Sequence, residues 1–189
     1  MRLHRVTFAM LALLSPLAQG AAICDDTMDR TAPSARYIDN GNGTVTDQHT
    51  NLVWMRCRLG QTWNGTTCLG EPTPYYWQQG LQMAERIRSD SSHALYHFGG
   101  ISQWRLPDIK ELITLVEHAC MKPSLNDTIF PRAMAGEGKE VRDGYVYLMS
   151  ATVAPFNGQM VYLDVTTGDI GYRQFAAYQD QLLLVASKP

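Results

Sequence analysis

Four cysteines constrain the fold of this 189-residue chain more than any other feature of its sequence. An even number of cysteines in a chain with an export signal is typical of disulfide bonds, and four thiols allow three pairings. Cys57 and Cys68 flank a segment rich in turn residues, so a local bridge between them is the economical choice. Cys24 would then pair with Cys120. A zinc site is the alternative, but no Cys-x-x-Cys pair is present to favour it.

The first 22 residues predict that export signal. Residues 6–14 are almost wholly apolar, yet they are too short to cross a bilayer about 30 Å thick as a helix. The alternative, a buried N-terminal helix, does not explain why this run has no polar face. The order of segments is that of a cleavable signal peptide, with a basic start and small residues after the apolar run. These flanking residues are Arg2, His4, Arg5, Pro16, Ala18, Gly20, Ala21 and Ala22.

We therefore expect cleavage after Gly20 or Ala22, and a mature protein in the periplasm, in the medium or at the cell surface. A lipoprotein anchored through Cys24 is disfavoured because Ile23 precedes it, where lipid attachment requires a small residue. No other stretch is long and apolar enough to span a membrane.

Chain length and charge limit the classes of partner. Removal of the signal leaves 167 residues (189 minus 22), enough for one domain, predicted over 37–189 after a polar lead-in at 23–36 that only Cys24 holds in place. The 16 Lys and Arg lose Arg2 and Arg5 with the signal, so 14 basic residues face 18 acidic ones, a net charge of −4. A nucleic acid is therefore not an expected partner, because it requires a basic footprint.

The remaining pattern predicts an α+β domain with two helices packed on small antiparallel sheets. Short strands at 44–46 and 52–55 form a β-meander, and the spacing of apolar residues predicts a helix over 76–88. A second helix begins at Pro107-Asp108, where Asp108 and Glu111 form a capping box, and Cys120 lies at its end. A long irregular segment at 121–144 follows. Four further strands are expected at 145–149, 159–165, 169–175 and 181–186.

Two local motifs have a structural and a functional interpretation. Asp39 and Asp47 surround glycines, but Gly41 and Gly43 stand where an EF-hand loop would need oxygen ligands, so turns are favoured over a calcium site. In the motif around Trp104, the structural interpretation places Trp104 and Leu106 in the core and makes Arg105 an internal strut. Trp54 and Trp77 are also expected in the core.

Several motifs in succession resemble the Lcl C-terminal domain family, named for the C-terminal domain of the Legionella collagen-like adhesin. They cover residues 37 to 186, and their order along the chain is highly specific. The matching stretches are Asn40-Gly-Asn-Gly-Thr-Val-Thr-Asp47, Thr50-Asn-Leu-Val-Trp54, the insert from Cys57 to Cys68, Trp104-Arg-Leu-Pro-Asp-Ile-Lys-Glu-Leu112 and Asn126-Asp-Thr-Ile-Phe-Pro131.

The resemblance implies a fold related to C-type lectins and formylglycine-generating enzymes, and a place outside the cytoplasm. For the adhesin it implies binding of sulfated polysaccharides through a trimer. This chain departs from the family at Leu148-Met149-Ser150-Ala151 and lacks the usual arginine in its last strand. It has no collagen-like repeats, so the multivalency of the adhesin does not carry over.

The expected function is binding of a sulfated or acidic polysaccharide. Enzymatic activity is disfavoured because no histidine stands in a recognisable nucleophile motif, and neither a metal nor a cofactor is expected. The alternative is an accessory subunit of a pilus or secretion system that binds a surface protein; a homo-oligomer fits both. The ligand surface is expected at the 121–144 loop and the Arg173 hairpin, where aromatic rings stack on sugars and guanidinium groups bind sulfate. Its candidate residues are Arg132, Arg142, Arg173, Tyr172 and Tyr178.

Overall fold

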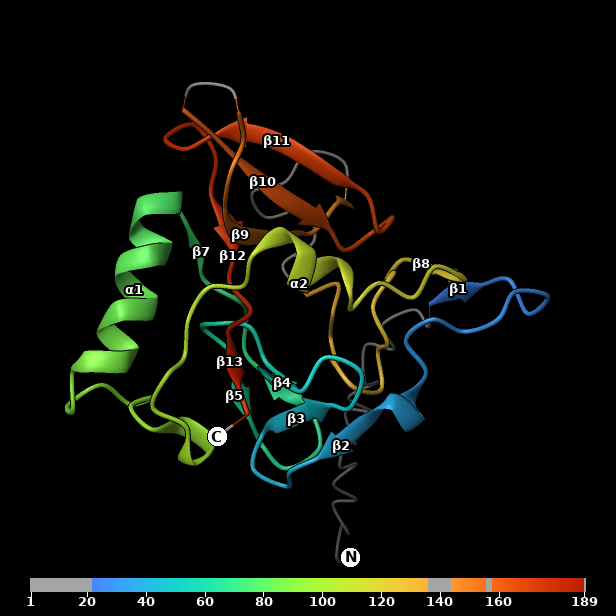
Figure 1. Ribbon diagram of the computed structural model, residues 1–189, viewed down its shortest axis with the longest axis horizontal. Coiled ribbons are helices and arrows are strands. Elements are labelled where there is room, and N and C mark those ends of the chain that lie inside the picture. The colour runs from blue at the N-terminus through green and yellow to red at the C-terminus, as the bar shows by residue number, and fades with distance from the viewer. Residues whose placement is uncertain (1–21, 136–143, 156–157, 189) are drawn as a thin grey trace, which may run out of the picture.

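The computed structural model describes residues 22–135, 144–155 and 158–188, and it confirms the α+β class (Figure 1). The predicted signal peptide lies outside the described residues except for Ala22, and Arg142 lies outside them as well. Within the described residues, no helix has the length and apolar character that a membrane span requires.

The larger sheet has five strands in the order β11-β10-β9-β12-β7. Its neighbouring strands are antiparallel, except that β12 runs parallel to β9. The three strands expected at 145–149, 159–165 and 169–175 are confirmed with shifted ends as β9, β10 and β11. The five strands are β7 (Pro74–Tyr75), β9 (Tyr147–Val153), β10 (Gln159–Asp164), β11 (Ile170–Gln174) and β12 (Asp180–Gln181).

The smaller sheet has four antiparallel strands in the order β13-β4-β3-β2, and it contains the predicted meander. Two short strand pairs complete the β-structure: β1 (Ile23–Cys24) with β8 (Cys120–Met121), and β5 (Thr62–Trp63) with β6 (Cys68–Leu69). The strands of the smaller sheet are β2 (Tyr37–Asp39), β3 (Thr44–Asp47), β4 (Leu52–Met55) and β13 (Val185–Ser187).

Both predicted disulfides are confirmed. Cys24 bonds to Cys120 and so joins β1 to β8, while Cys57 bonds to Cys68 and closes the loop that contains β5 and β6. The sulfur of Cys24 is therefore committed to Cys120, as the argument against lipid attachment expects.

Helix α1 (Trp77–Ser89) packs against the larger sheet through Gly80, Ala84 and Ile87. Gly80 allows a close approach, because a Cβ atom at this position would lie 2.6 Å from the sulfur of Met149. Trp77 stacks on Phe175 with ring centroids 4.3 Å apart. The predicted helix over 76–88 is thus confirmed, with its apolar face on the sheet.

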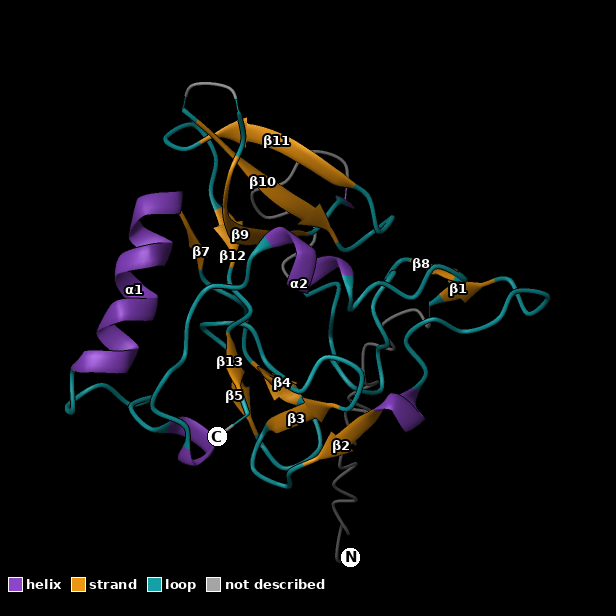
Figure 2. Cartoon of the chain, in the orientation of Figure 1, coloured by secondary structure: helices purple, strands orange, loops and turns teal. Residues whose placement is uncertain are grey.

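Helix α2 (Ile109–Ile113) is much shorter than expected. The predicted capping box is present: Asp108 accepts a hydrogen bond from the Glu111 N–H at 2.8 Å, and Glu111 accepts one from the Asp108 N–H at 2.9 Å. Turns follow Ile113, and Cys120 lies in β8 instead of at a helix end. Figure 2 shows α2 beside β9 and β10, which it contacts.

The strand expected at 181–186 is divided between the two sheets. β12 belongs to the larger sheet and β13 to the smaller one, with buried Leu182, Leu183 and Leu184 between them. The carbonyl groups of Leu182 and Leu184 accept hydrogen bonds from Leu59 and Met55, respectively. This connection therefore carries the core from one sheet to the other.

The lead-in at 23–36 is held by more than Cys24, which corrects the expectation. The backbone N–H groups of Thr31 and Ala32 donate to the carboxylate of Glu117 at 3.0 and 2.9 Å. Arg36 forms a buried ion pair with Asp47, and a short 3-10 helix (Ser34–Arg36) precedes β2. The lead-in is thus part of the folded unit.

Candidate ligand-binding groove

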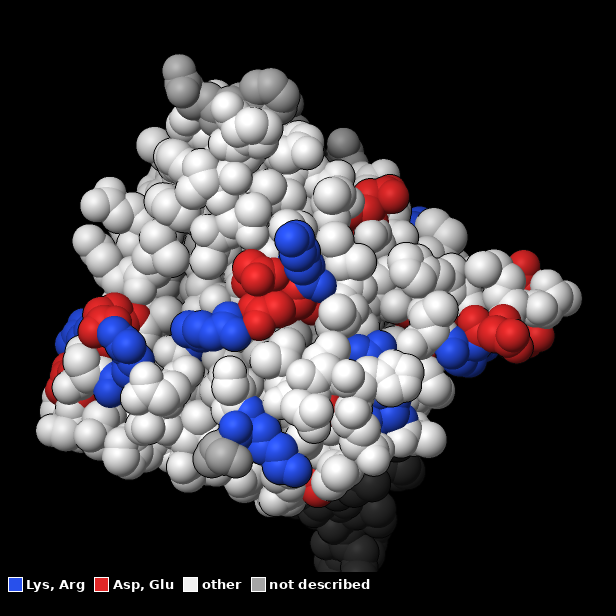
Figure 3. All heavy atoms as spheres, in the orientation of Figure 1, with Lys and Arg blue, Asp and Glu red and all other residues white. Residues whose placement is uncertain are grey.

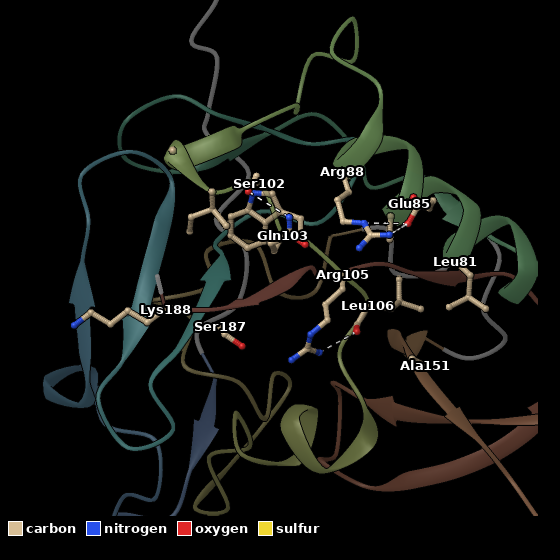
Figure 4. Close-up of a pocket in the computed structure, with 14 residues that line it drawn as sticks. Leu81, Glu85, Arg88, Ser102, Gln103, Arg105, Leu106, Ala151, Ser187 and Lys188 are labelled. Atoms are coloured by element: carbon tan, nitrogen blue, oxygen red, sulfur yellow. Dashed lines mark hydrogen bonds and ion pairs between the residues drawn. The ribbon is translucent and has the colours of Figure 1, made fainter.

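An open groove of about 830 Å³ lies between the C-terminal half of α1 and the segment 100–106 (Figure 4). Ligand sites in proteins typically have volumes of about 300–1,000 Å³. Leu81, Glu85 and Arg88 reach it from one stripe of α1, spaced at i, i+4 and i+7. The other lining residues are Ala84, Gly100, Ile101, Ser102, Gln103, Trp104, Arg105, Leu106, Ala151, Ser187 and Lys188.

The motif around Trp104 is extended beside β13, and this conformation decides which of its side chains reach the groove. Arg105 exchanges two backbone hydrogen bonds with Val185, both 3.0 Å long. Side chains of an extended segment alternate between its two sides, so Trp104 and Leu106 are buried, as expected. Trp54 is buried as well, while Trp77 is only half-buried.

Arg105 corrects the structural interpretation, because its side chain is 44% exposed and is not an internal strut. It forms a bidentate ion pair with Glu111, with distances of 2.7 and 2.6 Å. These hydrogen bonds from Arg105 hold the pKa of the Glu111 carboxyl group below its ordinary value. Pro107 is buried next to this pair, ahead of α2.

Three cations surround the groove. Arg88 pairs with Glu85 one helical turn away, and both side chains are about half exposed. Lys188 is exposed and has no side-chain partner among the residues that the structure describes. Figure 3 shows basic and acidic groups side by side over α1 and near α2, with uncharged surface between them. The groove thus combines an apolar floor with cations at its rim.

Such a site suits an anionic, hydroxyl-rich ligand. Guanidinium groups bind sulfate or carboxylate in a bidentate manner, and the present partners of Arg88 and Arg105 are exposed enough to exchange for ligand oxygens. Serine and glutamine side chains at the groove, among them Ser102 and Gln103, can donate to and accept from sugar hydroxyls.

Arg132, one of the predicted ligand residues, serves an internal contact. Its guanidinium donates to the carbonyl of Gly70 at 2.7 Å and pairs with Glu71 at 2.9 Å. It therefore connects the segment 131–135 to the disulfide-closed loop. Only a quarter of the side chain remains exposed.

Arg173 is more deeply enclosed. Its guanidinium lies 4.0 Å from the ring centroids of Tyr147 and Tyr162 and 5.0 Å from that of Tyr178, and it pairs with buried Asp180. We call these five residues the tyrosine cage. With 12% of its side chain exposed, Arg173 offers little surface to a ligand.

The structure does not unite the predicted ligand residues. Tyr172 and Tyr178 are both about half exposed, but Tyr172 points to the opposite face of β11 from Arg173 because side chains alternate along a strand. Arg142 lies outside the described residues. The sequence did contain a signal for the groove, since Leu81 and Arg88 share a helical stripe; Lys188 gave none.

The histidines do not form a metal site among the described residues. His93 and His97 have the i, i+4 spacing of a helical zinc pair, but they lie in turns before a short 3-10 helix (Phe98–Gly100). The Nδ1 atom of His93 accepts a hydrogen bond from the Leu95 N–H, and His97 stacks on Tyr96. No cluster of three metal-ligating side chains occurs in the described part of the chain.

The fold and the groove define a disulfide-bonded α+β domain with a cationic, open binding surface. Comparison with known families assigns it: the chain belongs to the Lcl C-terminal domain family, whose model matches residues 43–186. The predicted family membership is therefore confirmed. No curated protein and no solved structure matches the chain, so the relation to C-type lectins and formylglycine-generating enzymes stays a prediction.

Proposed function

We propose that this domain is exported and binds a sulfated or acidic polysaccharide in the groove beside α1. The observation that carries the proposal is the set of three cations, Arg88, Arg105 and Lys188, around one open and largely apolar groove. The two arginines are presented by rigid elements, the helix α1 and the segment bonded to β13. A polymer can lie along such an open surface without entering a closed cavity.

Export is supported by the cysteines and by the N-terminal sequence. Both disulfides require an oxidising compartment, and residues 1–22 have the sequence pattern of a signal peptide. Membership in the Lcl C-terminal domain family supports a place at the cell surface or outside the cell.

The groove replaces the surface around Arg132 and Arg173 as the place of binding. Those two arginines are paired with internal partners, so their replacement by alanine would test the fold as much as the ligand. Arg88 and Arg105 are 46% and 44% exposed and pair only with exposed or half-exposed carboxylates. Their substitution is the cleaner test.

The experiment compares two double variants on immobilised heparin. Arg88→Gln with Arg105→Gln removes both charges but keeps hydrogen-bonding side chains, and we expect about tenfold weaker retention or less. Arg86→Gln with Arg30→Gln removes the same number of charges elsewhere and should elute like the unmodified protein. Equal elution of the two variants, or no retention of the unmodified protein on heparin or fucoidan, would refute the proposal.

A subunit of a surface assembly is the second candidate, and the edge strand β11 favours it. Ile170 and Tyr172 on this strand are 47% and 51% exposed, and its outward side chains carry no charge that would discourage pairing with another strand. A blank glycan array, together with a protein partner whose capture is lost in Tyr172→Lys, would favour this candidate over polysaccharide binding.

A further inference from the structure

A second pocket, of about 450 Å³, lies on the flank of α1 away from the groove. It is formed between the helix and the edge strand β7, which Figure 1 shows beside α1. We call it the β7 pocket. Its lining residues are Pro74, Tyr75, Gln79, Gln82, Met83 and Arg86.

The helix residues of the β7 pocket form a single stripe. Gln79, Gln82, Met83 and Arg86 are spaced at i, i+3, i+4 and i+7, so they share one face and extend over about 10 Å of helix. The stripe that lines the groove begins at Leu81, two residues and about 200° further around the helix axis. Helix α1 therefore separates two sites that do not share a side chain.

Hydrogen-bonding capacity in the β7 pocket is largely unused. Gln82 has no side-chain partner among the described residues. The carbonyl oxygen of the Gln79 side chain accepts from the Tyr76 N–H at 3.3 Å, which leaves its NH₂ group as a donor. Arg86 is 64% exposed, and its contact with Asp90 is long, at 3.5 Å.

This combination of groups fits a particular ligand chemistry. Side-chain amides donate and accept at once, which matches sugar hydroxyls, and the half-buried ring of Tyr75 beside Pro74 offers an apolar face to a sugar ring. The pocket has one guanidinium, where the groove has three cations. A single planar guanidinium suits one carboxylate through two parallel hydrogen bonds.

We propose that the β7 pocket is a separate subsite for a uronate, a sugar ring that carries one carboxylate. Tyr75 and Pro74 pack against the ring, Gln79 and Gln82 bind its hydroxyls, and Arg86 binds the carboxylate. The inference rests on the proposed function in that it assigns a second sugar site to a polysaccharide-binding domain. Its site and ligand differ from those of the groove, so each can fail alone.

The test measures binding of an unsulfated galacturonate oligosaccharide by isothermal titration calorimetry, with a dextran oligosaccharide as the uncharged comparison. We expect the unmodified protein to bind the galacturonate and to bind the dextran at least tenfold more weakly. Gln82→Ala with Arg86→Gln should weaken galacturonate binding at least tenfold and leave heparin retention unchanged. All four side chains changed in these two pairs of variants are exposed, so thermal unfolding should report intact folding.

The reciprocal variant separates the two proposals. Arg88→Gln with Arg105→Gln should bind the galacturonate like the unmodified protein, whatever happens to its heparin retention. The inference is overturned if this variant loses the galacturonate, if Gln82→Ala with Arg86→Gln retains it, or if the unmodified protein does not bind it. Failure on heparin with normal galacturonate binding would overturn the groove alone.

Discussion

At the scale of single residues, Asp180 is the most strongly perturbed acid of the tyrosine cage. Burial raises its pKa to about 6, an effect that outweighs the attraction of Arg173. One of its carboxylate oxygens, Oδ1, lies 2.5 Å from Arg173, while Oδ2 is buried without a hydrogen-bond partner among the described residues. The folded protein therefore binds a proton at Asp180 more tightly than the unfolded chain does.

This pKa predicts how stability depends on pH. Because the folded pKa lies above the unfolded value of about 4, stabilisation by the proton is present below pH 4 and is lost as the pH rises through 6. Asp180→Asn cannot ionise. Its free energy of unfolding, relative to the unmodified protein, should therefore rise by on the order of 3 kcal/mol between pH 4 and pH 7.

Urea unfolding of both proteins at several pH values checks this prediction. The comparison uses the change in the difference with pH, so an overall loss of stability in Asp180→Asn does not affect it. A difference that stays constant or falls as the pH rises would contradict the raised pKa.

At the scale of elements, Gly80 makes α1 sensitive to a single methyl group. Alanine normally stabilises a helix relative to glycine by about 1 kcal/mol. At this position a Cβ atom would lie 2.6 Å from the sulfur of Met149 and 3.3 Å from Leu182. We expect Gly80→Ala to destabilise the protein by about 1–3 kcal/mol through overpacking.

Denaturant unfolding of Gly80→Ala measures this cost. Gln78→Ala, a change on the exposed face of the same helix, is the matched control and should alter the stability by less than about 0.5 kcal/mol. Stabilisation by Gly80→Ala would show that α1 does not pack against β9 as closely as described.

The sequence predicted elements well where local pattern and tertiary contacts agree. The apolar stripe of α1 and the turn residues around the meander determine those elements locally. It failed for the segment after Ile113, where the backbone N–H of Glu117 bonds to Ser124 and its carboxylate binds the lead-in. These partners are distant in sequence, so a helical pattern alone could not reveal them.

The candidate site could be predicted only in part for the same reason. The motif at Trp104 was recognised, but the exposure of Arg105 depends on its pairing with Val185, which lies 80 residues further along the chain. Arg132 and Arg173 appeared free in the sequence because their partners, Glu71 and the tyrosine cage, come together only in the fold.

At the scale of the whole molecule, two disulfides hold the fold at very different chain separations. Cys24 and Cys120 are 96 residues apart, while Cys57 and Cys68 are 11 residues apart. In the chain-entropy model, the longer loop stabilises by about 4–5 kcal/mol and the shorter one by about 3 kcal/mol. The long bridge also fixes the lead-in, which covers buried parts of the core such as Ala32.

Replacement of each pair by serine should therefore affect stability unequally. We expect Cys24→Ser with Cys120→Ser to lose more free energy of unfolding than Cys57→Ser with Cys68→Ser, by about 2 kcal/mol. Chemical unfolding of the purified mature protein measures both losses, and thiol titration of the unmodified protein should find no free sulfhydryl. The opposite order of the two losses would contradict the role given to the long bridge.

The location of polysaccharide binding is tested most directly by nuclear magnetic resonance. A sulfated heparin tetrasaccharide is added to the isotope-labelled mature protein, and the backbone amide shifts are followed. The largest changes should occur at residues 81–88 and 100–106, on the two sides of the groove. Changes centred on the Arg173 hairpin, or no changes at all, would contradict binding in this groove.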